Sequence, residues 1–240
     1  MKAIILAAGF GTRLMPLTNK TPKCLIPING KPLLGNWLDL LVYQGFSEVL
    51  INTHYLAKEV DKYIESYTDQ NDINFKIHTV YEEKPLGTAG TVWNNQKFVG
   101  SSDCIIINGD LLSNIDLRDL YRFHINNKYP ASLSYILTDN PIGKGVMELD
   151  KDSKIIKFEE KPKIPFSNKI YSGIQVLNSK IFEILPFSDI KDNNYMNLNF
   201  GYHIWPRLIG QMAAFKLDCF LIDIGDIDSY KRAQKTWKNK

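Results

Sequence analysis

The 240-residue chain has few cysteines, no long apolar run and little charge imbalance, and each shortage excludes a class of protein. Its three cysteines, Cys24, Cys104 and Cys219, lie far apart and form no CxxC pair. We therefore expect neither a disulfide framework nor a zinc site, and we predict a reducing, cytoplasmic location. No apolar stretch reaches the length that spans a bilayer, which predicts no membrane association. The formal net charge of +3 gives no argument for nucleic-acid binding.

Apolar segments alternate with amphipathic ones along the chain, and this alternation predicts an α/β fold. Hydrophobic residues make up 44% of the chain and charged residues 23%, as in ordinary globular proteins. In the first 110 residues the expected strands are 3–8, 48–52, 75–81 and 104–108, and the expected helices are 33–43, 57–67 and 88–95.

The second half of the chain is richer in expected strands, namely 132–137, 145–149, 155–158, 170–177 and 215–224. A last helix should run from about Asp226 to the C-terminus, with Asp226 as its N-cap. We predict a Rossmann-like α/β fold, with a mixed, mainly parallel sheet flanked by helices, in a single domain over residues 1–240.

In the segment LAAGFGTR, a glycine-rich loop begins at Gly9, directly after the first expected strand, and leads to Arg13. Its small residues let a ligand approach the backbone, and its amides can cradle phosphates. It is neither a P-loop nor a dinucleotide fingerprint, since Leu14 stands at the third glycine position. Arg13 and Lys23 add a bidentate cation and a point charge for phosphates. A plain strand-to-loop turn also needs glycine, so the loop alone leaves both interpretations open.

Two aspartates are candidate metal ligands. Asp110 follows an expected parallel strand, and the carboxyl ends of such strands face the ligand crevice, although an aspartate in this position taken alone is more often a turn former. Asp223 lies in an apolar strand, where a carboxylate is costly unless it is paired or bound to metal. Mg²⁺ is typically held by one or two carboxylates plus substrate phosphates. The two side chains would share Mg²⁺, which lowers phosphate charge and aligns the attack.

The segments LAAGFGTRLMPLT and TPKCLIPINGKPLL resemble the signature of the sugar-phosphate nucleotidyltransferases, and the resemblance extends over essentially the whole chain. It implies Mg²⁺-dependent transfer of a nucleoside monophosphate from an NTP to a sugar 1-phosphate, giving an NDP-sugar and pyrophosphate. It also implies a nucleotide-binding half over residues 1–110 and a smaller sugar-binding lobe over residues 111–240. Within the family the similarity leans toward mannose- or heptose-1-phosphate guanylyltransferases. Such relatives typically serve polysaccharide biosynthesis.

The resemblance also implies roles for individual residues. Arg13 would hold the leaving pyrophosphate, Lys23 the reacting phosphates, and Asp110 the metal, with Lys161 as the fourth catalytic residue. The implied nucleotide-binding residues are Leu6, Ala8, Gly9, Gly11, Thr12, Glu82, Gly87, Asn108 and Gly109.

Three motifs of the second half carry the sugar side of the resemblance. FEEKP matches a family motif in which Lys161 would bind the sugar 1-phosphate and Glu160 would bond sugar hydroxyls. Gly145 would let the sugar pass close to the backbone. Tyr171 stands where the family commonly has asparagine, which puts the identity of the sugar in doubt.

The late segment FLIDIGD resembles the family motif WxDxGT, with Asp223 on its aspartate. Leu221 replaces an aromatic residue and Asp226 a threonine. Neither departure touches the proposed metal ligand.

The base and the sugar stay open at this stage. Glu82 lies in a segment that resembles the family's base-binding loop, and a carboxylate suits the two adjacent donors of guanine. Alternatively, Glu82 and Glu83 face solvent, and His54 is an ordinary loop histidine. A CTP:phosphocholine-type cytidylyltransferase, a uridylyl- or thymidylyltransferase, and an inactive regulatory subunit are the other candidates. The oligomeric state is also open, and a homo-oligomer is allowed.

Overall fold

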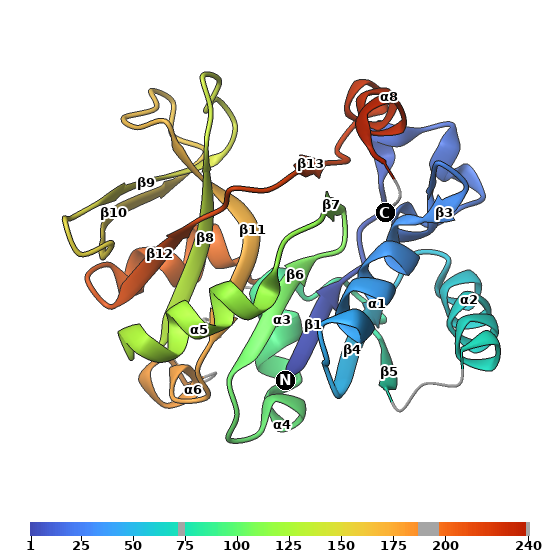
Figure 1. Cartoon of the computed structure of the whole chain (residues 1–240), viewed down its shortest axis with the longest axis horizontal. Helices are drawn as coiled ribbons and strands as arrows, with labels where there is room; N and C mark the ends of the chain where they lie inside the picture. The colour runs from blue at the N-terminus through green and yellow to red at the C-terminus, as the bar shows by residue number, and fades with distance from the viewer. Residues whose placement is uncertain (72–74, 187–196, 239–240) are drawn as a thin grey trace. The chain divides into compact units, whose positions relative to one another are not determined.

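The computed structural model describes residues 1–71, 75–186 and 197–238, and the chain divides into two compact units. Unit 1 comprises Met1–Pro85, Ile107–Ile115 and Cys219–Lys240, and unit 2 comprises Leu86–Ile106 and Asp116–Asp218. Figure 1 labels the elements of both units. None of the helices in the described ranges is long and apolar enough to cross a membrane.

Unit 1 contains a parallel sheet of β1 (Lys2–Leu6), β4 (Glu48–Thr53) and β5 (Lys76–Tyr81). The strand β6 (Cys104–Asn108) ends in this unit and lies beside β1, so the strand order is β6-β1-β4-β5. The order reverses at β1. In α/β sheets, ligands bind outside the carboxyl ends of the strands at such a reversal, so this edge is where a site is expected.

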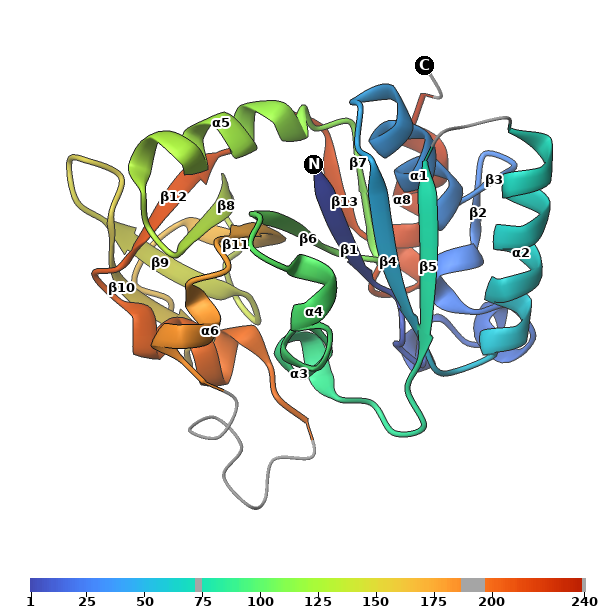
Figure 2. The same ribbon diagram turned by 90° about the horizontal axis from the view of Figure 1, so that it is seen from below.

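Helices and short elements complete unit 1. The helix α1 (Leu33–Tyr43) buries Trp37 and Leu41, and α2 (Ala57–Gln70) packs against β5 (Figure 2). A core cluster that includes Leu14, Leu112 and Ile224 lies under the glycine loop. The remaining elements are the 3₁₀ turns η1 (Thr12–Leu14), η2 (Leu17–Asn19) and η3 (Lys23–Leu25), the strand pairs β2 (Pro27–Ile28) with β3 (Lys31–Pro32) and β7 (Leu111–Ser113) with β13 (Leu221–Asp223), and the helix α8 (Ile227–Thr236).

Unit 2 is built on antiparallel pairs in the order β10-β9-β11-β8, with β12 parallel to β8. The helix α5 packs against β8, β11 and β12 (Figure 1). The strands are β8 (Ala131–Leu137), β9 (Gly145–Leu149), β10 (Ile155–Glu160), β11 (Lys169–Leu177) and β12 (Met212–Lys216). The helices are α3 (Gly87–Asn94), α4 (Gln96–Val99), α5 (Leu117–Asn127), α6 (Ile181–Ile184), the π-helix η4 (Phe200–Ile204) and the 3₁₀ turn η5 (Trp205–Leu208).

The predicted α/β class, with a mixed, mostly parallel sheet flanked by helices, is confirmed. The prediction of one strand over 215–224 is wrong. That apolar run supplies two strands, because β12 pairs with β8 in unit 2 whereas β13 pairs with β7 in unit 1. The helix α5, capped by Asp116, was not predicted. The last helix begins after the predicted cap Asp226 and ends at Thr236. The single domain with halves at 1–110 and 111–240 stays a prediction.

Candidate active site

The ends of β1 and β6 are joined in unit 1 by a glycine contact. The Gly109 N–H donates to the Leu6 carbonyl at 2.9 Å. A β-carbon on Gly109 would lie 2.7 Å from the same oxygen, closer than real β-carbons come. Only glycine therefore fits between Asn108 and Asp110, and the predicted nucleotide-binding residues Leu6, Asn108 and Gly109 lie side by side.

The glycine loop bends at Gly11 and presents its tip to solvent. Gly11 has φ of +66°, and a β-carbon there would lie 2.8 Å from the Thr18 methyl carbon. The Thr18 hydroxyl donates to the Gly11 carbonyl at 2.9 Å, which holds the bend. Ala8 is half-buried, whereas Gly9, Thr12 and Arg13 are exposed. The loop thus leaves backbone and a guanidinium accessible to an anionic ligand.

Lys23 and Asp110 form an ion pair in the same unit. Lys23 Nζ lies 2.6 Å from Asp110 Oδ2, and the two side chains are 12% and 33% exposed. A lysine held against a carboxylate at a sheet edge is a preorganised cation, which stabilises charge that develops on a reacting phosphate.

Asp223 lies beside Asp110 because of how β13 pairs. Asp223 is in register with Leu111 of β7, and the Ile224 N–H donates to the Asp110 carbonyl at 2.9 Å. Asp223 Oδ1 is shielded from solvent. Adjacent strand ends therefore bring the two predicted metal ligands together.

The Arg13 guanidinium lies near the Asp223 carboxylate. Arg13 Nη2 and Asp223 Oδ1 each lie 3.4 Å from the point where a β-carbon on Gly225 would sit. Asp226 is exposed and caps α8, and hydrogen bonds from Ser229 hold the pKa of its carboxyl below the usual value. The capping function explains Asp226 without a metal.

The carboxylates fit a hard divalent cation. Asp110, after β6, and Asp223, at the end of β13, would offer oxygen ligands of the kind that Mg²⁺ prefers. Over residues 1–71, 75–186 and 197–238, no group of three or more His, Cys, Asp or Glu side chains could hold a metal ion. A metal on two carboxylates would complete its coordination with water and substrate phosphates.

Glu82 is buried, at 4% exposure, whereas Glu83 is exposed. The prediction that Glu82 could face solvent is therefore wrong. Its carboxylate accepts a hydrogen bond from Asn52 Nδ2 at 2.9 Å, and its backbone carbonyl lies 2.7 Å from His54 Nδ1. Its burial and its specific hydrogen-bond donor make Glu82 a candidate for ligand recognition.

The predicted sugar-side residues lie in unit 2. Glu160 Oε2 lies 2.6 Å from the point where a β-carbon on Gly145 would sit, and a β-carbon on Gly201 would collide with the same carboxylate. Burial raises the pKa of Glu160, while Lys161 and Lys144 act in the opposite direction. Lys161 is exposed, and its backbone N–H donates to the Lys144 backbone carbonyl at 3.1 Å.

Tyr171 is held by its neighbours. Its hydroxyl donates to Gln175 Oε1, and its ring packs edge-on against Phe158 and Trp205. Burial, with a contribution from Glu160, raises its pKa well above the usual value, so the phenol stays protonated. Gly87, with φ of +78°, begins α3 in the same unit.

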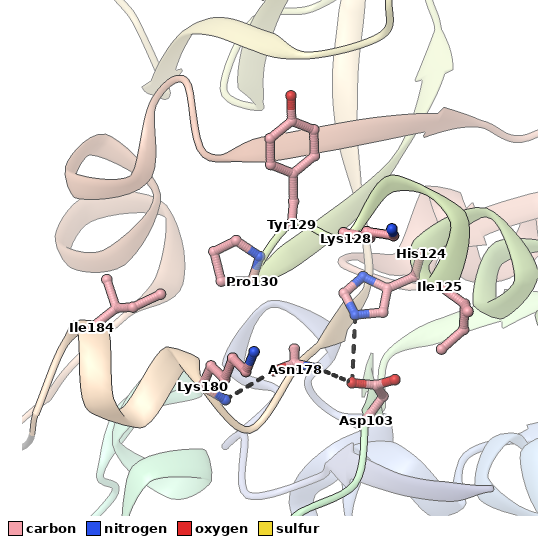
Figure 3. A pocket seen from close by; sticks show the side chains of 9 residues that line it. All are labelled: Asp103, His124, Ile125, Lys128, Tyr129, Pro130, Asn178, Lys180 and Ile184. Carbon is pink, nitrogen blue, oxygen red and sulfur yellow. Dashed lines mark hydrogen bonds and ion pairs between the residues drawn. The ribbon is translucent and has the colours of Figure 1, made fainter.

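Cys24 and a cavity in unit 2 are not part of the candidate active site. Cys24 is buried, and burial raises the pKa of its thiol to about 12, as expected for a structural residue. In unit 2, a cavity of about 380 Å³ is lined by Asp103, His124 and Asn178 (Figure 3). Asp103 Oδ1 accepts from Asn178 Nδ2 at 2.6 Å and lies 3.7 Å from His124 Nε2. His124 Nδ1 lies 2.9 Å from Ser132 Oγ, and no predicted site residue lines the cavity.

Asn52, Thr18 and Gly201 were missed by the sequence reasoning, whereas His54 was considered and interpreted as an ordinary loop histidine. A signal existed for Asn52, because a polar residue near the carboxyl end of an apolar parallel strand is the pattern that identified Asp110. No local pattern identifies Thr18 or Gly201.

The fold and these residues define an α/β protein with a glycine loop, two cations and two adjacent carboxylates in unit 1, which are groups that can bind phosphates and a metal. A family model described as Nucleotidyl transferase matches residues 2–240, and the chain belongs to this family. Members of the family generally use a divalent metal.

Similar proteins support this assignment. The chain is 31% identical over 239 residues to probable mannose-1-phosphate guanylyltransferase 1 of Oryza sativa subsp. japonica, covering 96% of this chain and 63% of that protein. The chain thus spans about three fifths of the length of that relative. The HddC structure from Yersinia pseudotuberculosis, also solved with GMP-PN, is 29% identical and covers 99% of both chains, with a TM-score of 0.79 without that ligand. A Bacillus anthracis structure solved with sucrose, provisionally assigned as a glucose-1-phosphate thymidylyltransferase, is 26% identical, covers 100% of this chain and 97% of its own, and has a TM-score of 0.88.

Proposed function

We propose that this chain transfers a nucleoside monophosphate from an NTP to a sugar 1-phosphate. A phosphate oxygen of the sugar 1-phosphate attacks the α-phosphorus of the NTP. The bond from the α-phosphorus to the bridging oxygen breaks, pyrophosphate leaves, and the NDP-sugar remains. No covalent enzyme intermediate is needed.

The Lys23–Asp110 ion pair beside the glycine loop carries this proposal. Phosphoryl-type transfer depends on positioned charge rather than on a protein nucleophile. The pair combines a cation for the reacting phosphates with a carboxylate that can hold a metal. An inactive binding subunit has no need of both together with Arg13 and Asp223.

Asp110 and Asp223 would hold Mg²⁺, which supplies charge neutralisation on the phosphates. Arg13 would bind the leaving pyrophosphate through its bidentate guanidinium. In unit 2, Lys161 would bind the phosphate of the sugar 1-phosphate and Glu160 the sugar hydroxyls.

GTP is the preferred nucleotide in this proposal, and mannose 1-phosphate or a heptose 1-phosphate is the acceptor. A buried, fixed carboxylate at Glu82 accepts from two adjacent donors, as guanine offers on its Watson–Crick edge. The name of the rice relative and the GMP-PN complex of HddC support the same base. The location would be cytoplasmic, the chain could assemble as a homo-oligomer, and the product would serve polysaccharide precursors.

Pyrophosphate release by the purified protein with Mg²⁺ tests the proposal. GTP, CTP, UTP, dTTP and ATP are crossed with several sugar 1-phosphates and phosphocholine. We expect one pair to react, and Asp110→Asn to lower kcat by at least ~100-fold, the size of effect that loss of one positioned group produces. Asp69→Asn, an exposed aspartate of α2, is the control and should keep full activity. Reaction with CTP and phosphocholine, or no reaction from folded protein, contradicts the proposal.

A further inference from the structure

A buried polar relay joins the carboxyl ends of β1, β4 and β5 in unit 1. Its centre is Asn52, which is 3% exposed and lies in β4. Asn52 Oδ1 accepts from the Ala7 N–H at 2.7 Å, and Asn52 Nδ2 donates to Glu82 Oε1 at 2.9 Å. The bond from Ala7 defines the orientation of the amide, because a backbone N–H can only donate, and this places the Asn52 NH₂ group toward Glu82.

The backbone of Glu82 is also held by hydrogen bonds. Its N–H donates to the Thr53 carbonyl at 2.8 Å. Its carbonyl accepts from His54 Nδ1 at 2.7 Å, which requires that this nitrogen carry the proton. The His54 ring is in turn packed by Phe10 and Tyr81, at centroid distances of 5.0 and 6.4 Å.

When hydrogen bonds hold both the side chain and the backbone of a glutamate, its carboxylate can discriminate between hydrogen-bonding partners. A site built around a fixed polar group rejects ligands that leave this group unpaired. Guanine offers two adjacent N–H donors, whereas uracil and thymine offer one donor flanked by carbonyls, and those carbonyls would face a carboxylate oxygen. A carboxylate free to rotate would lose part of this discrimination.

We propose that Asn52 is a positioning residue that sets the base preference of the nucleotide site by orienting Glu82. The inference rests on the proposed function, in which Glu82 reads the base. Asn52 itself does not contact the nucleotide. It acts through the bond to Glu82, and the bond to Ala7 ties this orientation to the start of the glycine loop.

The polarity of the relay can be reversed with two substitutions. In Asn52→Asp, the new carboxylate still accepts from the Ala7 N–H but faces the Glu82 carboxylate, so the bond between them is lost. In the double variant Asn52→Asp with Glu82→Gln, the aspartate accepts from the glutamine NH₂ group. The glutamine then turns its carbonyl oxygen and its second N–H toward the base, a pattern that suits uracil or thymine rather than guanine.

The test is the ratio of kcat/KM for GTP to kcat/KM for UTP in the wild-type protein and the variants. Asn52→Asp and Asn52→Ala should each lower this ratio on the order of ten- to a hundredfold, mainly through a higher KM for GTP. The double variant should prefer UTP or dTTP. Asn36→Asp, which removes an amide donor to a backbone carbonyl at the start of α1, is the matched control and should leave the ratio unchanged.

The outcomes separate the inference from the proposed function. If Asn52→Asp does not fold, folded Asn52→Ala decides, and an unchanged ratio overturns the inference. A double variant that folds and still prefers GTP also overturns it. If the wild-type protein uses another nucleotide, the choice of GTP fails, yet Asn52→Ala must still change the ratio between nucleotides. If the wild-type protein binds no NTP in equilibrium dialysis with Mg²⁺, both are overturned.

Discussion

Two glycines of the candidate nucleotide site differ in what surrounds them. Around Gly9, nothing lies within 4 Å of the position of an added β-carbon. At Gly109 an added β-carbon would lie 2.7 Å from the Leu6 carbonyl oxygen and 3.2 Å from the Ile5 side chain. The first glycine leaves space for a ligand, and the second lets two strand ends touch.

Gly109→Ala should therefore destabilise the protein by about 1–3 kcal/mol, the usual cost of overpacking. Gly9→Ala should change the free energy of unfolding by about 0.5 kcal/mol or less, as for an exposed position. Urea unfolding followed by circular dichroism measures both. Equal stabilities of the two variants would show that the β1–β6 contact is not as tight as the distances indicate.

At the scale of elements, hydrogen bonds from α8 attach the C-terminal segment to Pro27 and Asn29. Gln234 donates to the Pro27 carbonyl at 2.7 Å and accepts from the Asn29 N–H at 2.8 Å. Asp226 and Ser229 form a capping box at the other end of the helix. The helix follows β13 directly, so its cap helps to keep Asp223 in place.

Asp226→Ala should cost about 1 kcal/mol at pH 7, as for loss of an N-cap. Because hydrogen bonds from Ser229 lower the pKa of Asp226 in the folded state, the charged cap contributes above the unfolded pKa of about 3.9. This contribution is lost as the pH falls through the lower, folded pKa. Denaturant unfolding from pH 7 down to about pH 2.5 should show the wild-type advantage shrinking.

Asp226→Asn provides the comparison for that pH series. Asparagine caps as well as aspartate but does not titrate, so its advantage over alanine should persist in acid. An advantage of the wild-type protein that is independent of pH would contradict the role of the charged cap.

At the scale of the whole molecule, unit 1 is assembled from three stretches of chain. Arg13 and Lys23 come from the first stretch, Asp110 from the second and Asp223 from the last. The core beneath them mixes the same stretches, since Leu14, Leu112 and Ile222 share one cluster. Unit 1 therefore depends on residues near both ends of the chain.

A chain that ends at Asp218 should lose the cooperative thermal transition of unit 1 and its binding of GTP with Mg²⁺. It lacks β13, the partner of β7, together with Asp223 and α8. A chain that ends at Trp237 keeps all of these, including the contact of Trp237 with Phe220, and should melt and bind as the full chain does. Unchanged GTP binding by the shorter chain would contradict this assembly.

Local patterns in the sequence determined much of the fold. The periods of apolar residues predicted α1 at the bounds Leu33–Tyr43 and β6 at Cys104–Asn108, because both elements bury their apolar side chains in the ordinary way. The glycine loop and Asp110 were predicted from residue type and position after a strand. Lys23 was predicted from its charge and from the family-like segment TPKCLIPINGKPLL, which is also local information. The last apolar run was misread because a strand pattern does not say which sheet it joins.

The tertiary structure alone decided which distant residues meet. Asn52 and Glu82 are 30 positions apart and meet because β4 and β5 pair in the register observed here. Lys23, in η3, and Asp110, after β6, are 87 positions apart and meet only through the packing of unit 1. Burial of Glu82 likewise follows from that packing, since its sequence neighbours Tyr81 and Glu83 are both exposed. Periodicity encodes which side of an element is buried. The partners across the sheet are set by register and chain topology, which no local pattern contains.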